Sequence, residues 1–134
     1  MHYVEITRDQ WPEHCESFSL QHHGWLVNVR RVTTADLEEA RDATLAAAEP
    51  LAEEQPLQAV TLWQDGQTGL AVTVGEGDAT QTFEVRDVRR LWRERADGAH
   101  QGLRIDSDGG TSLLVEFRRP ARPEELDGLA ASEL

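Results

Sequence analysis

Histidines and the single cysteine are the residues of this sequence best suited to metal binding or nucleophilic chemistry. His22 and His23 are adjacent in the tetrapeptide HHGW, and neighbouring residues of a helix point about 100° apart, which keeps their rings from converging on one ion. His14 and His22 would be separated by roughly 12 Å of helical rise, which is also too far to share an ion. We therefore expect no metal and no cofactor, and we interpret HHGW as a helix end flanked by surface histidines.

Several catalytic classes are excluded by missing residues and motifs. All 13 basic residues are arginine, so the sequence has no lysine to form a Schiff base or to complete a Walker A motif. G-x-S-x-G, G-x-G-x-x-G and H-E-x-x-H motifs are also missing from the sequence. Cys15 shares a predicted helical face with Trp11 and Phe18, which favours a buried, inert thiol. No residue is therefore assigned a catalytic role.

The most distinctive charged segment is RDVRRLWRER at residues 86–95, where five arginines surround one tryptophan. Arginine beside an aromatic ring could clamp RNA bases or a phosphorylated ligand. The simpler interpretation is a solvated strand whose arginines pair with carboxylates, for example those of residues 34–56. Together with an exposed Trp63, the candidate binding surface consists of Arg86, Arg89, Arg90, Trp92, Arg93 and Trp63.

The net charge and the hydropathy of the chain limit the kinds of partner that it can bind. The net charge of −12 opposes binding to nucleic acid and to anionic membranes, and residues 34–56 carry half of it, with seven carboxylates against one arginine. The segment MHYVEITRDQW has neither the basic n-region nor the apolar h-region of a signal peptide, and no apolar run approaches the roughly 18 residues that a membrane span needs, so we expect neither feature. A single cysteine fits a reducing compartment. We expect a cytoplasmic protein with a protein or small-molecule partner, acting alone or as a homodimer.

The N-terminal part predicts a helix and then a strand. Trp11, Cys15 and Phe18 follow helical spacing between residues 9 and 23, with Asp9 as the N-cap and Gly24 as the residue that ends the helix. The next segment, GWLVNVRRV, alternates as a half-buried strand does.

A second helix is predicted at residues 35–48. Thr33-x-x-Asp36 resembles a capping box, the following segment is rich in alanine, and Pro50 would end the helix.

After Pro56 the sequence becomes a series of short alternating segments separated by QDGQ, GEGD, ADGA and DSDGG. Asp-Gly between alternating segments is a strong hairpin signal. The expected inward residues are Val60, Leu62, Leu70, Val72, Val74, Phe83, Val85, Leu103, Ile105, Leu113, Val115 and Phe117. The sequence thus predicts a mainly β (α+β) single domain over residues 1–134, an antiparallel meander of about six or seven strands forming a small barrel or sandwich, with residues 120–134 as a flexible tail.

The N-terminal segment resembles a small bacterial family classified as a domain of unknown function, with the pattern R-x-x-W-x-x-x-x-x-x-F-S-x-x-H-x-G-W-L-V. Its positions are occupied here by Arg8, Trp11, Phe18, Ser19, His22, Gly24, Trp25, Leu26 and Val27. A Pro-Leu element at residues 56–57 and a hairpin at residues 108–111 extend the resemblance. The resemblance implies a shorter, more strand-like segment at residues 33–55, and it supplies no catalytic residues.

The function expected from the sequence is a non-catalytic binding or protein-interaction module. One alternative is a small enzyme with a histidine and carboxylate site in a barrel mouth. The other is an RNA-binding adaptor that uses Arg89, Trp92 and Arg93.

Overall fold

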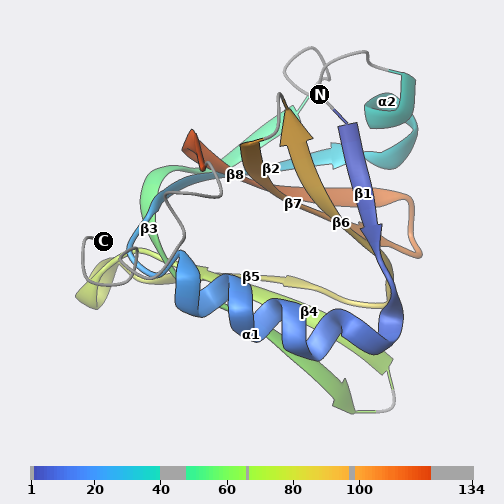
Figure 1. Ribbon diagram of the computed structural model, residues 1–134, viewed down its shortest axis with the longest axis horizontal. Coiled ribbons are helices and arrows are strands. Elements are labelled where there is room, and N and C mark those ends of the chain that lie inside the picture. Colours follow the sequence, from blue (N-terminus) through green and yellow to red (C-terminus); the bar gives the residue numbers. More distant parts are fainter. Residues whose placement is uncertain (1, 40–47, 66, 97–98, 122–134) are drawn as a thin grey trace.

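The computed structural model describes residues 2–39, 48–65, 67–96 and 99–121 (Figure 1). Its elements are, in chain order, β1 (His2–Ile6), a 3₁₀ turn (Arg8–Gln10), α1 (Trp11–Gln21), β2 (Leu26–Thr33), α2 (Thr34–Glu39), β3 (Ala48–Asp65), β4 (Gln67–Val74), a 3₁₀ turn (Gly77–Ala79), β5 (Gln81–Val85), β6 (Val88–Ala96), β7 (Ala99–Ser107) and β8 (Thr111–Ala121). The prediction of a mainly β chain with an N-terminal helix is confirmed.

All strands pair antiparallel in one eight-stranded sheet of order β1-β6-β7-β8-β2-β3-β4-β5. Two meanders, β3-β4-β5 and β6-β7-β8, are joined by β2, which pairs with β8 on one side and β3 on the other. Strand β3 serves both halves of the sheet, because its first part pairs with β2 and its second part pairs with β4 (Figure 1). The sheet is not closed into a barrel, since β1 and β5 form its two edges.

The core lies between the curved sheet and α1. Alternating residues of the strands meet the apolar face of α1, on which Trp11, Cys15 and Phe18 are all buried. Every residue expected to face inward belongs to this core or packs against it. Trp11 also donates a hydrogen bond from Nε1 to the carbonyl of Ile6 over 2.8 Å, which fixes the helix against the end of β1.

HHGW ends the helix, as the sequence predicts. His22 is the C-cap of α1 and Gly24 has φ of 86°, a left-handed conformation that glycine adopts readily. His23 is exposed, whereas Trp25 is half-buried. The expectation that both histidines lie at the surface is wrong for His22, which is 3% exposed. Its ring centroid lies 4.5 Å from those of Phe18 and Phe117, with the rings tilted against one another.

The start of α1 also differs from the prediction. Asp9 lies in the 3₁₀ turn, and the N-cap position is occupied by Gln10, which makes no side-chain capping hydrogen bond. Pro12 falls in the first turn of the helix, where a missing N–H is tolerated. The helix begins at Trp11 because burial of the indole and its hydrogen bond to Ile6 place the first turn there.

The second helix is shorter than predicted. The backbone N–H of Asp36 donates to Thr33 Oγ1 over 3.4 Å, which confirms the cap, but α2 spans only Thr34–Glu39. Ala48 is already paired with Val32 in β3, so the helix does not extend to residue 48; residues 40–47 lie outside the described part of the chain. Pairing with β2 outweighs the helical propensity of alanine at this position.

The start of the predicted tail differs as well. Residues 120 and 121 belong to β8, and residues 122–134 lie outside the described part. The hairpin before β8 forms as predicted, with Gly110 at φ of 85°.

We predict that Phe18→Ala lowers the free energy of unfolding by about 3–5 kcal/mol, because it leaves a cavity under α1. Phe18 is 5% exposed, whereas Leu20 on the same helix is 67% exposed. Leu20→Ala is therefore the matched control and should change stability by less than about 0.5 kcal/mol in urea denaturation. A loss below about 1 kcal/mol for Phe18→Ala would show that α1 packs loosely on the sheet.

Candidate functional site

The six residues of the predicted binding surface do not share one face of the protein. In β6, Leu91 belongs to the core and Arg93 lines a hollow beside α1, whereas Trp92 hydrogen-bonds on the opposite face of the sheet. Arg90 lies on that opposite face too, with its guanidinium 5.9 Å from the ring centroid of Trp92. The strand alternation therefore separates Arg93 from Trp92.

The other three candidates lie elsewhere. Arg86 is exposed in the link between β5 and β6, where its Nη2 lies 3.8 Å from Oε2 of Glu84. Arg89 is exposed near the start of β6. Trp63 lies in the distant part of β3 with its ring against Gly69 of β4. Among the described residues, the acidic segment 34–56 pairs with Arg31 and Arg104 rather than with the arginines of β6.

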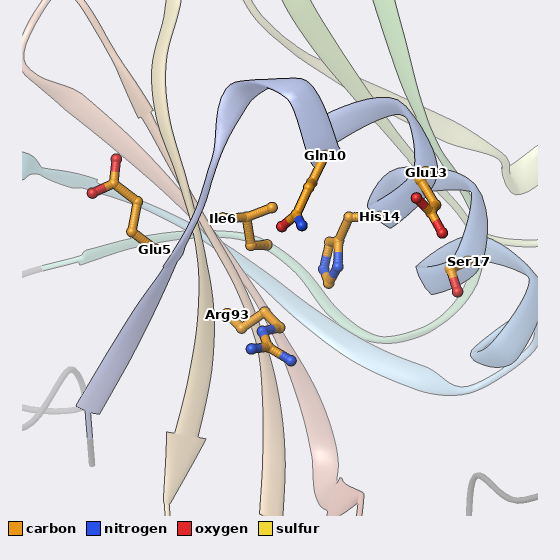
Figure 2. Close-up of a pocket in the computed structure, with 7 residues that line it drawn as sticks. All are labelled: Glu5, Ile6, Gln10, Glu13, His14, Ser17 and Arg93. Carbon is orange, nitrogen blue, oxygen red and sulfur yellow. The ribbon is translucent and has the colours of Figure 1, made fainter.

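A cleft runs along α1 on the side that faces β6 and β7 (Figure 2). It consists of two adjacent hollows, of about 280 and 200 Å³, which share the lining residues His14, Ser17 and Arg93. We call it the α1 cleft; its outer end is completed by Glu5, Ile6, Gln10 and Glu13, and its inner end by Phe18, Gln21, His22 and Gly102. The combined space suits a small molecule rather than a folded partner.

The helix supplies one wall of the α1 cleft through a polar stripe. Gln10, His14, Ser17 and Gln21 recur three or four residues apart, which places them on one side of α1 next to its apolar face. This spacing is the sequence signal for the site, but by itself it predicts only the polar side of an amphipathic helix. The polar stripe leaves room against the sheet where an apolar face would pack.

Arg93 forms the opposite wall. Its backbone pairs with Val4 of β1 and Leu103 of β7. The residue is half-buried, and its guanidinium lies below the ring of His14 (Figure 2). Within the described residues, no side chain or carbonyl forms a hydrogen bond or ion pair with this guanidinium, although a guanidinium carries five N–H donors. The cleft thus contains an arginine whose donors are open to a ligand.

The inner end of the cleft is closed by the backbone of β7. Gly102 has φ of 149° at a register shift between β7 and β8, and a Cβ atom here would lie 1.8 Å from the carbonyl oxygen of Val115. Only glycine fits this position. His22 beside it is held in place because its Nδ1 lies 2.8 Å from the carbonyl oxygen of Phe18.

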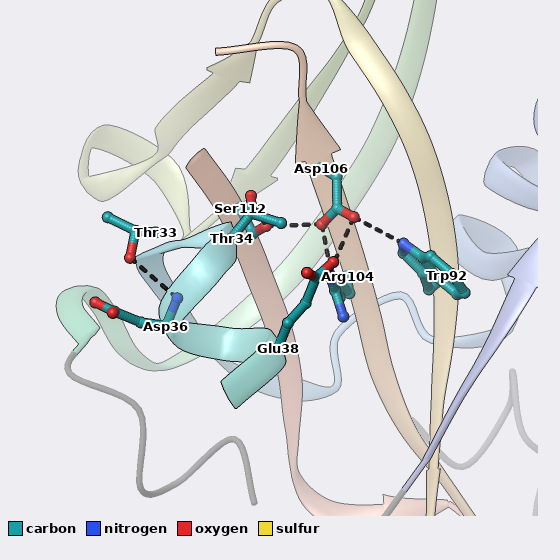
Figure 3. A network of polar contacts seen from close by, with 8 residues as sticks. All are labelled: Thr33, Thr34, Asp36, Glu38, Trp92, Arg104, Asp106 and Ser112. Atoms are coloured by element: carbon teal, nitrogen blue, oxygen red, sulfur yellow. Dashed lines mark hydrogen bonds and ion pairs between the residues drawn. The ribbon is translucent and has the colours of Figure 1, made fainter. Parts of the chain in front are cut away.

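A second polar cluster lies on the opposite face of the sheet, under α2 (Figure 3). Arg104 donates to both carboxylate oxygens of Asp106, over 2.8 and 3.2 Å, and Trp92 and Ser112 donate to the same carboxylate over 2.9 and 2.7 Å. Thr34 Oγ1 is 2.8 Å from Ser112 Oγ, which connects the start of α2 to the network.

This buried network is structural. Arg104 reaches Glu38 of α2 over 3.4 Å, and its guanidinium lies 4.9 Å from the ring centroid of Tyr3. Burial, and then the nearby Glu94 carboxylate, raise the pKa of the Tyr3 phenol, so it stays neutral. The network holds α2 and β1 on the sheet, and its two buried charges, on Arg104 and Asp106, are paired with each other. Alternation with the inward residues Leu103 and Ile105 predicts Arg104 and Asp106 at exposed positions of a strand, so no sequence pattern indicates this network.

A third hollow, of about 590 Å³, lies over the irregular pairing of β2 and β3 and is bordered by Asn28, Glu53 and Glu54. Its arginine, Arg30, is already engaged in an ion pair with Glu116. Of the hollows described, the α1 cleft is therefore the one lined by an arginine that has no ion-pair partner among the described residues.

Comparison of the chain with protein-family models, curated proteins and solved structures found no match. Within the described ranges, no three metal-ligating side chains are grouped as a metal site would require, and no helix there has the length and apolar character needed to cross a membrane. The geometry of the α1 cleft is therefore the basis of the functional argument.

We predict that Asp106→Ala lowers the free energy of unfolding by about 3–5 kcal/mol, because it leaves the buried Arg104 guanidinium without its main counterion. Glu84→Ala, which removes the exposed partner of Arg86, is the control and should cost less than about 1 kcal/mol. Equal losses for the two variants in chemical denaturation would show that the network is open to solvent.

Cys15 should be inert in the folded protein. Burial raises the pKa of its thiol to about 11, so little thiolate is present at pH 8. We expect a disulfide-exchange reagent to label the native protein far more slowly than the urea-unfolded chain, with the native rate rising as the pH approaches 11. Rapid labelling of the folded protein at pH 8 would contradict this.

Proposed function

We propose that this protein is a non-catalytic module that binds a small molecule in the α1 cleft. The observation that carries the proposal is the polar stripe of α1, which faces the sheet across an open space instead of packing on it. Concave sites with a few placed polar groups are the usual form of small-molecule sites.

The surroundings of the cleft support a preformed site. The floor is β6, which pairs with β1 and β7, and the helix wall is anchored by the buried side chains of Trp11, Cys15 and Phe18. A site between rigid elements loses little conformational entropy when a ligand binds. The proposal therefore requires no rearrangement of the described elements.

A small enzyme is the second candidate, favoured by one observation: His14, Ser17 and Glu13 of the same helix all line the cleft. A histidine and a carboxylate are the usual groups for acid–base catalysis. The two candidates differ in what happens to the ligand, because a binding module releases it unchanged. Mass spectrometry of a bound ligand after prolonged incubation distinguishes them.

The RNA-adaptor hypothesis receives less support. It requires Arg89, Trp92 and Arg93 to act on one surface, and Trp92 and Arg93 lie on opposite faces of the sheet. The net charge of −12 also opposes approach of a polyanion.

We predict that Ser17→Trp abolishes small-molecule binding, because the indole would fill the cleft. A fragment library of neutral, cationic and anionic compounds would be titrated while backbone amide shifts are followed by NMR. The amides of Ser17, Phe18 and Gly102 should respond in the unmodified protein.

Leu20→Trp adds the same side chain to an exposed position of α1 that lines none of the described hollows, so this control should bind as the parent does. Fragment binding that maps elsewhere, or that survives Ser17→Trp, would contradict the assignment of the cleft.

A further inference from the structure

We propose that the ligand of the α1 cleft carries a carboxylate group, which Arg93 binds through its guanidinium. This inference rests on the proposed function and adds the chemical class of the ligand.

Arg93 is placed to meet a ligand. It is shared by both hollows of the cleft, and Figure 2 shows its guanidinium extending into the space below His14. Its strand is paired on both sides, so the side chain starts from a rigid position. A group bound anywhere along the cleft would lie near this side chain.

Arg104 and Arg30 show how an arginine of this sheet is paired when a carboxylate lies beside it. Arg104 is paired with Asp106, and Arg30 with Glu116. Arg93 has no such counterion among the described residues, although it is half-buried in a concave site. A partly desolvated cation without a counterion is costly, and an anionic ligand group would offset that cost.

A carboxylate fits this site better than a phosphate. A guanidinium offers two parallel N–H donors to a planar carboxylate, and one cation matches one negative charge. Glu13 lies at the outer rim, and the whole chain carries a net charge of −12, so a dianionic group would meet more repulsion than a monoanion.

The inner end of the cleft limits the size and polarity of the part of the ligand beyond its carboxylate. Its volume is about 200 Å³, and it is lined by the rings of Phe18 and His22 and by Gly102. Such a space accepts a short organic body that is partly apolar. The class is therefore a small monocarboxylic acid.

The test uses the full chain and a set of monocarboxylates from acetate to benzoate, each paired with its primary amide, with inorganic phosphate as a further probe. Affinity is measured by NMR titration of the cleft amides. We expect at least one carboxylate to bind at least tenfold more tightly than its amide, because a hydrogen-bonded ion pair is replaced by neutral contacts.

Variants of two arginines on β6 then show which side chain binds the carboxylate. Arg93→Gln should weaken carboxylate binding at least tenfold, and Arg93→Lys, which keeps the charge but loses the planar fork, should weaken it several-fold. Arg89→Gln removes the same charge from an exposed position and should change affinity by less than about twofold. Thermal melting confirms that each variant is folded, and Arg93→Lys alone decides the outcome if Arg93→Gln unfolds.

Failure of the carboxylate inference and failure of the proposed function give different results. Equal affinity for acid and amide, with binding still lost in Ser17→Trp, would overturn the carboxylate and leave the small-molecule site standing. Tighter binding of phosphate than of every carboxylate would also overturn it. If Arg93→Gln and Arg93→Lys both bind as the parent does, Arg93 is not the anchor and the inference is wrong. If no probe, and no compound of the wider library, shifts the cleft amides, the inference and the proposed function both fail.

Discussion

The insertion of β2 between β8 and β3 is the pairing on which the rest of the structure depends. It joins two meanders that would otherwise be separate sheets, and its inward residues Val27 and Val29 are fully buried. Because β1 pairs at the far edge with β6, the chain must cross the core to reach β2, and α1 makes that crossing. The cleft exists because the crossing helix is apolar on one side and polar on the side that faces β6.

Local features of the fold could be predicted from the sequence. Alternation of apolar residues identified the inward side of β4, β7 and β8, and Gly24 marked the end of α1 because its left-handed conformation suits glycine. Non-local pairing could not be predicted in the same way. The edge position of β1 and the conversion of Ala48 from predicted helix to strand depend on partners far along the chain.

The candidate site was predicted only in part. Arg93 is among the candidate residues, but alternation along β6 places it on the opposite face of the sheet from Trp92. His22 reads as a surface residue at a helix end, yet the rings of Phe18 and Phe117 enclose it. The buried pair of Arg104 and Asp106 had no sequence signal, because charged residues on a strand are usually exposed and only the docking of α2 covers them.

The charged side chains on the two faces of the sheet differ in whether they have partners within the protein. Under α2, the carboxylate of Asp106 accepts four hydrogen bonds from three side chains, so the network is complete without any added molecule. Beside α1, a guanidinium faces an open space. The first arrangement stabilises a fold, and the second is what a binding site requires before its ligand arrives.

Gly102 has a consequence for how such a site can diverge between related proteins. Because a Cβ at this position would collide with the carbonyl of Val115, the sheet side of the inner cleft admits no new side chain there. Variation is confined to the opposite wall, where Ser17 and Gln21 lie on a helix whose core-facing residues are separate from them. Under the proposed function, ligand preference can therefore change by substitution along one helical stripe while the sheet and its pairing stay unchanged.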